Sequence, residues 1–76
     1  MELDIFVDKF AGQFEITNSE DIKANTSFKN LDEWDSLLSL SIIGMIKNVY
    51  NVKISGSDIK NATTIEELFN LVKSRM

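Results

Sequence analysis

The sequence predicts an all-α protein: a small bundle of three main helices plus one short helix, with a long loop between the first two main helices. Two observations lead to this fold class. Apolar residues recur at helical spacing in three separate segments, and a stretch rich in turn formers separates the first two of them. A chain of 76 residues is near the small end of what folds without disulfides or metals, so we expect residues 1–76 to form one domain.

The first helix is expected over residues 2–14. Its apolar residues recur at helical spacing and are Leu3, Phe6, Val7, Phe10 and Phe14. The charged residues between them, Asp4, Asp8 and Lys9, fall mostly on the opposite side. This division of side chains is typical of an amphipathic helix that packs one face against a core.

From residue 15 to residue 35 the helical spacing is lost. Turn and cap formers are frequent there: Asn18, Ser19, Asn25, Thr26, Ser27 and Asn30. The apolar residues expected to hold the stretch against a core are Ile16, Ile22, Phe28 and Leu31. We expect one short helical turn near residues 20–24. A loop of this length in a compact domain is often functional.

The second helix is expected from Ser36 to Tyr50. Its buried stripe is predicted to comprise Ile42, Ile43, Ile46 and Tyr50, with Ser39 at the top. Burial outweighs the slightly low helix propensity of isoleucine. The residues predicted to face solvent are Leu37, Ser41, Gly44, Lys47 and Asn48. Residues 36–50 contain no acidic residue and a single base, Lys47.

The remaining third of the chain is expected to hold the short helix and the last main helix. Residues 51–56 are predicted to form an extended linker and residues 57–61 one helical turn. Thr64 and Glu67 then have the spacing of a capping box, which predicts the start of the last helix. Its core-facing residues are Ile65, Leu68, Phe69 and Val72, and Lys73 and Arg75 complement its C-terminal dipole.

The residue types present exclude several classes of function. The chain has no cysteine and no histidine, so we expect no disulfide, no zinc or other metal site and no Ser-His-Asp triad. A net charge of −4 argues against nucleic acid as a partner. The first residues do not show the basic segment followed by an apolar run that is typical of a signal peptide, and no apolar run is long enough to span a bilayer. We therefore expect a cytoplasmic protein with no membrane span. A deep catalytic cleft has little room in so small a chain, so we do not expect an enzyme.

The most informative segment is Leu31-Asp-Glu-Trp-Asp-Ser-Leu37, which the apolar second helix follows at once. The triplet Asp35-Ser36-Leu37, at a helix start after a long loop, resembles the attachment motif of acyl and peptidyl carrier proteins. The resemblance covers the whole chain, because the spacing from the serine to Val52-Lys53-Ile54 and to residues 61–65 also fits. Trp34 recurs at its position in many carrier domains and is expected to act first as a lid on the core.

The resemblance implies a function and a cofactor-binding site. Ser36 would carry a 4′-phosphopantetheine arm, with Asp35 and Leu37 as its neighbours in the site. A separate phosphopantetheinyl transferase would attach the arm from coenzyme A, with Asp35 helping to position the transferase's magnesium. The arm's thiol would hold an acyl or aminoacyl group as a thioester and deliver it between acyl-loading and acyl-processing enzymes of a fatty acid, polyketide or specialised pathway. We expect a monomer that does not transform its cargo.

The local physical chemistry of Ser36 agrees with that role. A serine at a helix N-terminus is exposed, and a phosphodiester there lies near unsatisfied amides and the positive end of the dipole. Serine needs a base to act as a nucleophile, and the chain offers no histidine, which is consistent with modification by another enzyme. The plain alternative is that Ser36 is only an N-cap, and Asp35 only a helix-start acid.

The charge pattern bears on the partner-binding surface. Residues 1–35 carry nine acids and three lysines, a net charge of −6, whereas residues 36–76 carry three acids and five bases, a net charge of +2. Carriers of fatty acid synthesis typically have an acidic second helix, whereas the expected second helix of this chain contains no acidic residue. A specialised pathway, such as a secondary-metabolite or surface-polysaccharide cluster, is therefore favoured. The predicted recognition surface comprises Asp32, Glu33, Leu37, Leu38, Ser41, Lys47 and Ile54.

Two readings from other classes stay open. A non-carrier helical adaptor would bind a partner helix through Leu37, Leu38 and Leu40. An enzyme would need the carboxylates of Asp32, Glu33 and Asp35, for which the spacing gives no further support. Gain of a phosphopantetheine arm from coenzyme A separates the carrier from both.

Overall fold

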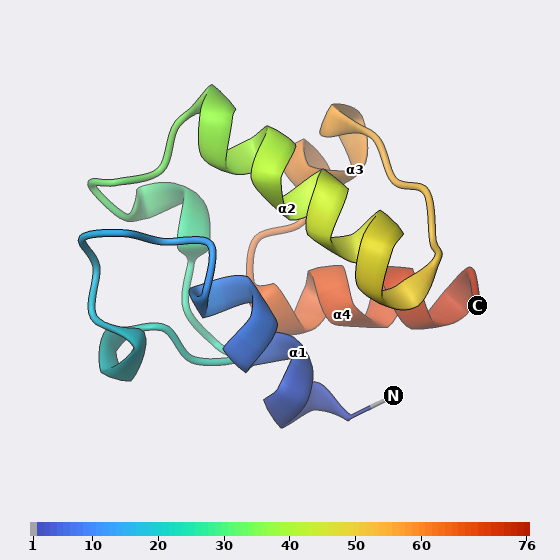
Figure 1. Cartoon of the computed structure of the whole chain (residues 1–76), viewed down its shortest axis with the longest axis horizontal. Coiled ribbons are helices and arrows are strands. Elements are labelled where there is room, and N and C mark those ends of the chain that lie inside the picture. The colour runs from blue at the N-terminus through green and yellow to red at the C-terminus, as the bar shows by residue number, and fades with distance from the viewer. Residues whose placement is uncertain (1) are drawn as a thin grey trace.

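Four α-helices and two single turns of 3₁₀ helix make up the regular structure of residues 2–76, the part of the chain that this computed structural model describes (Figure 1). The α-helices are α1 (Leu3–Ala11), α2 (Ser36–Tyr50), α3 (Gly56–Asn61) and α4 (Ile65–Ser74). The 3₁₀ turns are η1 (Ser19–Asp21) and η2 (Phe28–Asn30). Residues 2–76 contain no strand, so the predicted all-α class of three longer helices and one short one is confirmed.

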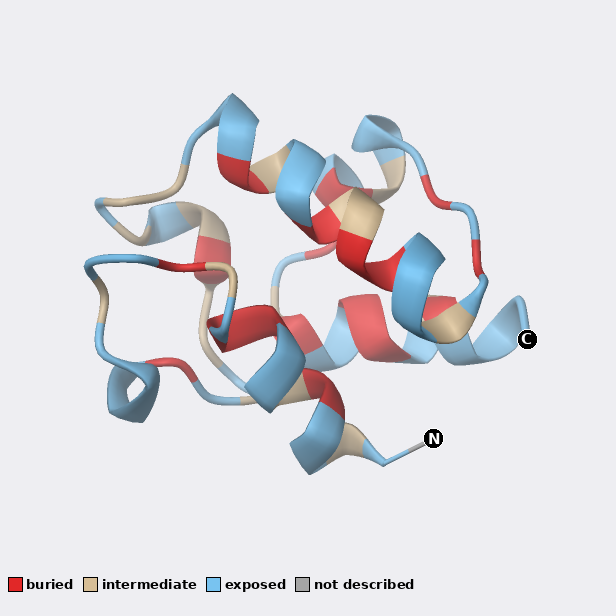
Figure 2. Cartoon of the chain, viewed as in Figure 1, coloured by how far each residue is buried: buried red, intermediate tan, exposed pale blue. Residues whose placement is uncertain are grey.

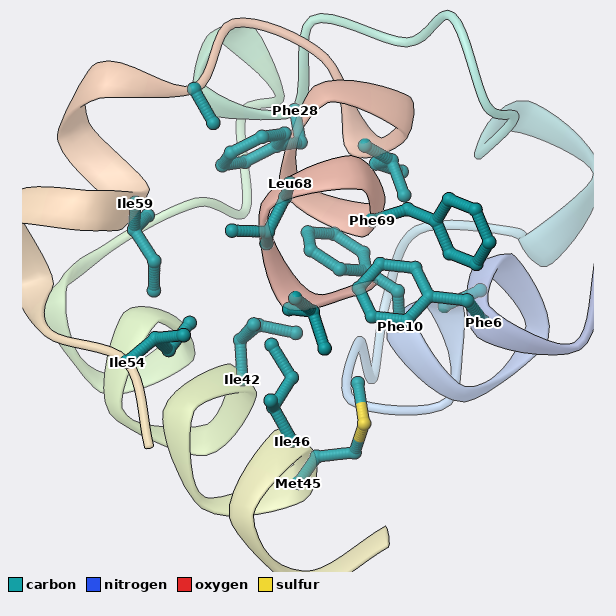
Figure 3. Packing of buried hydrophobic residues seen from close by; sticks show 14 of the residues in the cluster. Phe6, Phe10, Phe28, Ile42, Met45, Ile46, Ile54, Ile59, Leu68 and Phe69 are labelled. Carbon is teal, nitrogen blue, oxygen red and sulfur yellow. The ribbon is translucent and has the colours of Figure 1, made fainter. Parts of the chain in front are cut away.

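The helices surround one apolar core. Helix α1 contacts both α2 and α4, and α3 packs beside α2. Buried residues of all four helices face the centre of the molecule, while exposed residues cover the outside (Figure 2). Phe6, Phe10, Ile42, Ile46 and Leu68 are among the side chains that meet there (Figure 3). None of the helices in residues 2–76 has the length and apolar character needed to cross a membrane.

Helix α1 is shorter than predicted. It ends at Ala11, and the next residues continue in tighter turns, in which Gln13 N donates to Phe10 O (3.1 Å) and Phe14 N to Ala11 O (3.0 Å). Phe14 is still buried, so it joins the core from a turn and not from the helix. Helical spacing therefore identified Phe6, Phe10 and Phe14 correctly as buried, whereas Leu3 and Val7 are half-buried. It placed the helix end wrongly, because a tight turn preserves the same face.

Helix α2 has the predicted bounds. It ends where Asn51 adopts the left-handed conformation (φ 56°) and donates its N–H to Lys47 O. Its buried stripe is Leu38, Ile42, Met45 and Ile46, whereas Ile43 and Tyr50 are half-buried. The predicted stripe is thus rotated by part of a turn, which brings Leu38 and Met45 into the core.

The segment between α1 and α2 is held by aromatic side chains. Phe28, in η2, is completely buried and lies edge-on to Phe10 (5.2 Å between centroids) and to Trp34 (5.0 Å). Trp34 also stacks on Phe10 at 6.3 Å, so it covers the core as predicted. Ile16 was expected to help and does not, because its side chain is 83% exposed. The short turn lies at Ser19–Asp21, slightly earlier than residues 20–24.

Helix α3 is fixed at its N-terminus by a capping box that the sequence analysis missed. Ser55 Oγ accepts from Asp58 N, and Asp58 Oδ2 accepts from Ser55 N, so the helix begins at Gly56, one residue earlier than predicted. Arg75, at the end of α4, donates to both carboxylate oxygens of Asp58 (2.7 and 3.0 Å). These bonds from Arg75 and Ser55 hold the pKa of Asp58 at about 2. Arg75, predicted only to complement the dipole of the last helix, therefore also links the end of α4 to α3.

Helix α4 begins at its predicted cap with one difference. Thr64 Oγ1 accepts from Glu67 N (3.2 Å), but Glu67 Oε1 accepts from Thr63 N (3.1 Å), one residue before the position that a reciprocal capping box requires. All four predicted core residues of α4 are buried: Ile65, Leu68, Phe69 and Val72.

The burial of Phe28 gives a test of how the segment between α1 and α2 is held. Phe28→Ala is expected to lower the free energy of unfolding by about 3–5 kcal/mol, because it removes the ring that both Phe10 and Trp34 contact. Urea unfolding followed by circular dichroism measures the change. The matched control Ile16→Ala, at an exposed site of the same segment, should change stability by less than about 0.5 kcal/mol. Equal effects of the two substitutions would contradict the packing described.

Candidate functional site

Ser36 is the first residue of α2, at the point where the long segment from α1 meets the helix. Its side chain is exposed. Within residues 2–76 the structure records no hydrogen bond from the Ser36 hydroxyl. The amides of the first helical turn and the positive end of the helix dipole lie at this position, which favours an anionic substituent.

The cap of α2 is Asp35 and not Ser36. Asp35 has extended backbone geometry, and its Oδ1 accepts from Leu38 N at 2.8 Å. The alternative that Ser36 serves only as the N-cap is therefore wrong, because the neighbouring carboxylate occupies that role. The hydroxyl of Ser36 is left free for chemistry at the surface.

Glu33 binds the segment between the helices. Its Oε2 accepts from Glu15 N (2.8 Å), and its Oε1 accepts from Thr17 N (2.7 Å), from Thr17 Oγ1 (2.8 Å) and from Ile16 N (3.0 Å). Partial desolvation acts to raise the pKa of Glu33, but the bonds from these groups outweigh it and lower the pKa from 4.5 to about 2. The carboxylate predicted for partner recognition is thus engaged in hydrogen bonds within the chain, three residues before Ser36.

A groove of about 340 Å³ lies beside Ser36. The segment before α2, α2 itself and α3 all contribute to its lining, which includes Lys29, Trp34, Ser36, Ser39, Ile59 and Lys60. Sequence reasoning found Ser36 and Trp34 but missed the two lysines. Lys29 and Lys60 are far apart in the chain, and only the tertiary fold places both at this groove.

The residues predicted to contact partners do not all lie on one surface. Leu37 is 73% exposed, and Ser41 and Lys47 continue the same outward face of α2. Asp32 is also exposed, in the segment before the helix. Leu38 and Ile54 were predicted to be part of this surface and are instead buried, at 8% and 5% exposure. Leu38 belongs to the core stripe of α2.

The same outward face includes an apolar residue that was assigned only to the adaptor alternative. Leu40 is 64% exposed and lies one turn after Leu37. Gly44, predicted to face solvent, is half-buried. The face therefore presents two exposed leucines, small polar residues and one lysine, with no acid.

Comparison with family models found one match. The model described as the phosphopantetheine attachment site covers residues 4–72. Comparisons with curated proteins and with solved structures gave no significant match. The matched range includes the whole core and the groove beside Ser36.

The residues around Ser36 fit a phosphopantetheine arm. The arm begins with a phosphodiester, for which the ammonium groups of Lys29 and Lys60 are suitable partners. It continues as a chain of amides, which the hydroxyl of Ser39 and the apolar side chains of Trp34 and Ile59 can accommodate. The site thus combines an exposed hydroxyl with an adjoining groove whose side chains suit such an arm.

Glu33 gives a pH-dependent test of how the segment before Ser36 is held. Its folded-state pKa lies below the ordinary value, so its contribution to stability is complete above pH 4.5 and is lost as the pH falls toward about 2. Glu33→Gln should therefore unfold more easily than wild type at neutral pH and lose less stability over that acidic range. Thermal unfolding at a series of pH values measures both effects.

The matched control for this experiment is Glu15→Gln, which removes an exposed carboxylate from the same segment and keeps the Glu15 amide that donates to Glu33. It should follow the wild-type pH profile. Both variants should still lose some stability as the pH falls, because Asp58, whose pKa is also about 2, is present in each of them. A Glu33→Gln profile that matches wild type at every pH would show that these hydrogen bonds do not stabilise the fold.

Proposed function

Because the chain belongs to the family of carrier proteins that have a phosphopantetheine attachment site, we propose that Ser36 is the residue that bears the arm. Members of this family carry 4′-phosphopantetheine covalently. The observation that carries the assignment is the division of roles at the start of α2: Asp35 caps the helix and Ser36 keeps a free, exposed hydroxyl. Leu37 and Asp35 flank the serine in the site.

Attachment is a phosphoryl transfer to Ser36. The serine oxygen forms a bond to the phosphorus of the phosphopantetheine unit of coenzyme A, and the bond from that phosphorus to the oxygen that bridges the diphosphate breaks. Adenosine 3′,5′-bisphosphate leaves with the electron pair. The hydroxyl proton goes to a base of a separate transferase, because this chain has no histidine to take it. When bound, the arm supplies a thiol that holds an acyl or aminoacyl group as a thioester.

The outward face of α2 supports docking through apolar contact. Leu37 and Leu40 are its large exposed side chains, and the absence of acids from residues 36–50 removes the charge that would attract a basic partner. We assign to this face, together with Asp32 at its entrance, the recognition of the transferase and of the enzymes that load and process the cargo. A specialised pathway accounts for such a face better than bulk fatty acid synthesis.

The exposed leucines also favour the second candidate, a non-carrier adaptor that binds a partner helix. Leu37 and Leu40 are available for that contact, but Leu38, the third residue expected to take part, is buried. Two of the three leucines that the adaptor would use therefore remain exposed. The carrier reading uses the same two leucines together with the free hydroxyl of Ser36.

Loading of the arm tests the carrier assignment. The folded protein, incubated with coenzyme A, magnesium and a promiscuous phosphopantetheinyl transferase, should gain the mass of one phosphopantetheine, and Ser36→Ala should gain none. The matched control Ser57→Ala, also an exposed serine in the first turn of a helix, should be loaded as wild type is. Intact mass spectrometry gives the result. No loading of the wild-type protein, beside a loaded reference carrier, would contradict the proposal.

The apolar face of α2 gives a separate test by steady-state kinetics of loading. The double variant Leu37→Ala/Leu40→Ala should raise the transferase's KM for the carrier protein about tenfold, which corresponds to a loss of about 1.4 kcal/mol of binding free energy. The wild-type KM should change little with added salt, since Leu37 and Leu40, the large exposed side chains of the docking face, are uncharged. The control Val49→Ala alters an exposed apolar residue at the far end of the same helix. A steep rise of KM with salt would show that charge drives docking.

A further inference from the structure

Two lysines from distant parts of the chain meet at the groove beside Ser36. Lys29 comes from η2, before α2, and Lys60 comes from α3. Both line the same groove of about 340 Å³ as Ser36, with Trp34 and Ile59 as its apolar side chains. The groove is therefore lined by two lysine residues and by the serine at which the arm is proposed to begin.

The ammonium group of Lys29 is held in place. Its Nζ donates to the backbone carbonyl of Lys60 (2.5 Å) and lies 5.9 Å from the centre of the Phe28 ring. Because Phe28 is completely buried, the base of this side chain is fixed to the core. An ammonium group has three N–H donors, so two are left for a ligand after the bond to the carbonyl.

Neither lysine has an acidic partner in the described part of the chain. The single ion pair recorded there joins Arg75 to Asp58. Asp35 is the acidic residue of the groove lining, and its Oδ1 already accepts the amide of Leu38. The residues that line the groove thus include two lysines and one acid, in a protein whose net charge is −4. A local excess of positive charge on an acidic protein suits an anionic ligand.

We infer that Lys29 and Lys60 form an anion-binding subsite for the phosphodiester of the arm and hold the base of the arm in this groove. The inference rests on the proposed attachment at Ser36. A phosphodiester bears one negative charge and acceptor oxygens, which match two ammonium groups. The arm then leaves Ser36 across Trp34 and Ile59 toward α3, and is not free to point in every direction.

The test compares unloaded and loaded protein by NMR. Loading is first verified by intact mass, and the change in backbone amide shifts on loading is then measured at Gly56, Ile59 and Lys60, which lie on the α3 side of the groove. In wild type these residues should shift together with those next to Ser36. Lys60→Gln and Lys29→Gln should each reduce the α3 shifts about twofold, and salt at about 1 M, where the Debye length is about 3 Å, should do the same.

Lys53→Gln is the matched control, because it removes the same charge from an exposed residue outside the groove. It should leave the shifts as in wild type. Lys60→Gln keeps the backbone carbonyl to which Lys29 donates, so it tests the charge even if Lys29→Gln disturbs η2. The amide spectrum of each unloaded variant verifies its fold.

Each other outcome has a distinct meaning. Shifts confined to residues 35–38 in the loaded wild type, or α3 shifts unaffected by both lysine variants, would overturn the subsite. Failure of the lysine variants alone to load would also overturn it and place the lysines at the phosphates of coenzyme A. If the wild-type protein itself is not loaded while a reference carrier is, the attachment at Ser36 fails, and the subsite with it.

Discussion

Phe28 and Trp34, both from the segment between α1 and α2, pack against Phe10 of α1, and the position of the candidate site depends on this contact. The segment has two single turns of 3₁₀ helix as its only regular structure in the described chain. Ordering such a stretch costs backbone entropy at every residue, which the burial of aromatic rings offsets. The backbone bond from Glu66 N to Ala24 O (2.9 Å) adds an attachment to α4. Because Trp34 is packed in this cluster, the position of Asp35, the next residue, is fixed relative to the core.

The chemistry of Ser36 follows from how the acids before it are used. Glu33 accepts the amides of residues 15–17, and Asp35 accepts the amide of Leu38, so both carboxylates serve the fold. The serine that follows them needs no partner of its own. The same aromatic cluster places Lys29 beside Lys60, because the lysine follows Phe28 directly in the chain. The packing of Phe28 and Trp34 thus positions both the cap of α2 and the lysines of the groove.

The sequence was sufficient for features that depend on local spacing. The bounds of α2, the buried face of α4 and the exposed position of Ser36 all follow from residues within a few turns of each other. It was insufficient where distant residues meet. The acceptor role of Glu33 depends on amides 16–18 residues away, and the lysines at the groove are separated by 31 positions. Ile16 was wrongly predicted to pack against the core, because an apolar residue in a loop is buried only if the tertiary fold covers it.

The chain has one tryptophan, and it lies in the segment that the aromatic contact orders. Trp34 fluorescence therefore reports this segment, whereas far-ultraviolet circular dichroism reports the helices. If the segment is an integral part of the core, both signals should change at the same urea concentration, in a single two-state transition. A fluorescence transition at clearly lower urea than the loss of helix would show that the segment detaches from an intact bundle, and that the aromatic contact does not fix the position of Ser36.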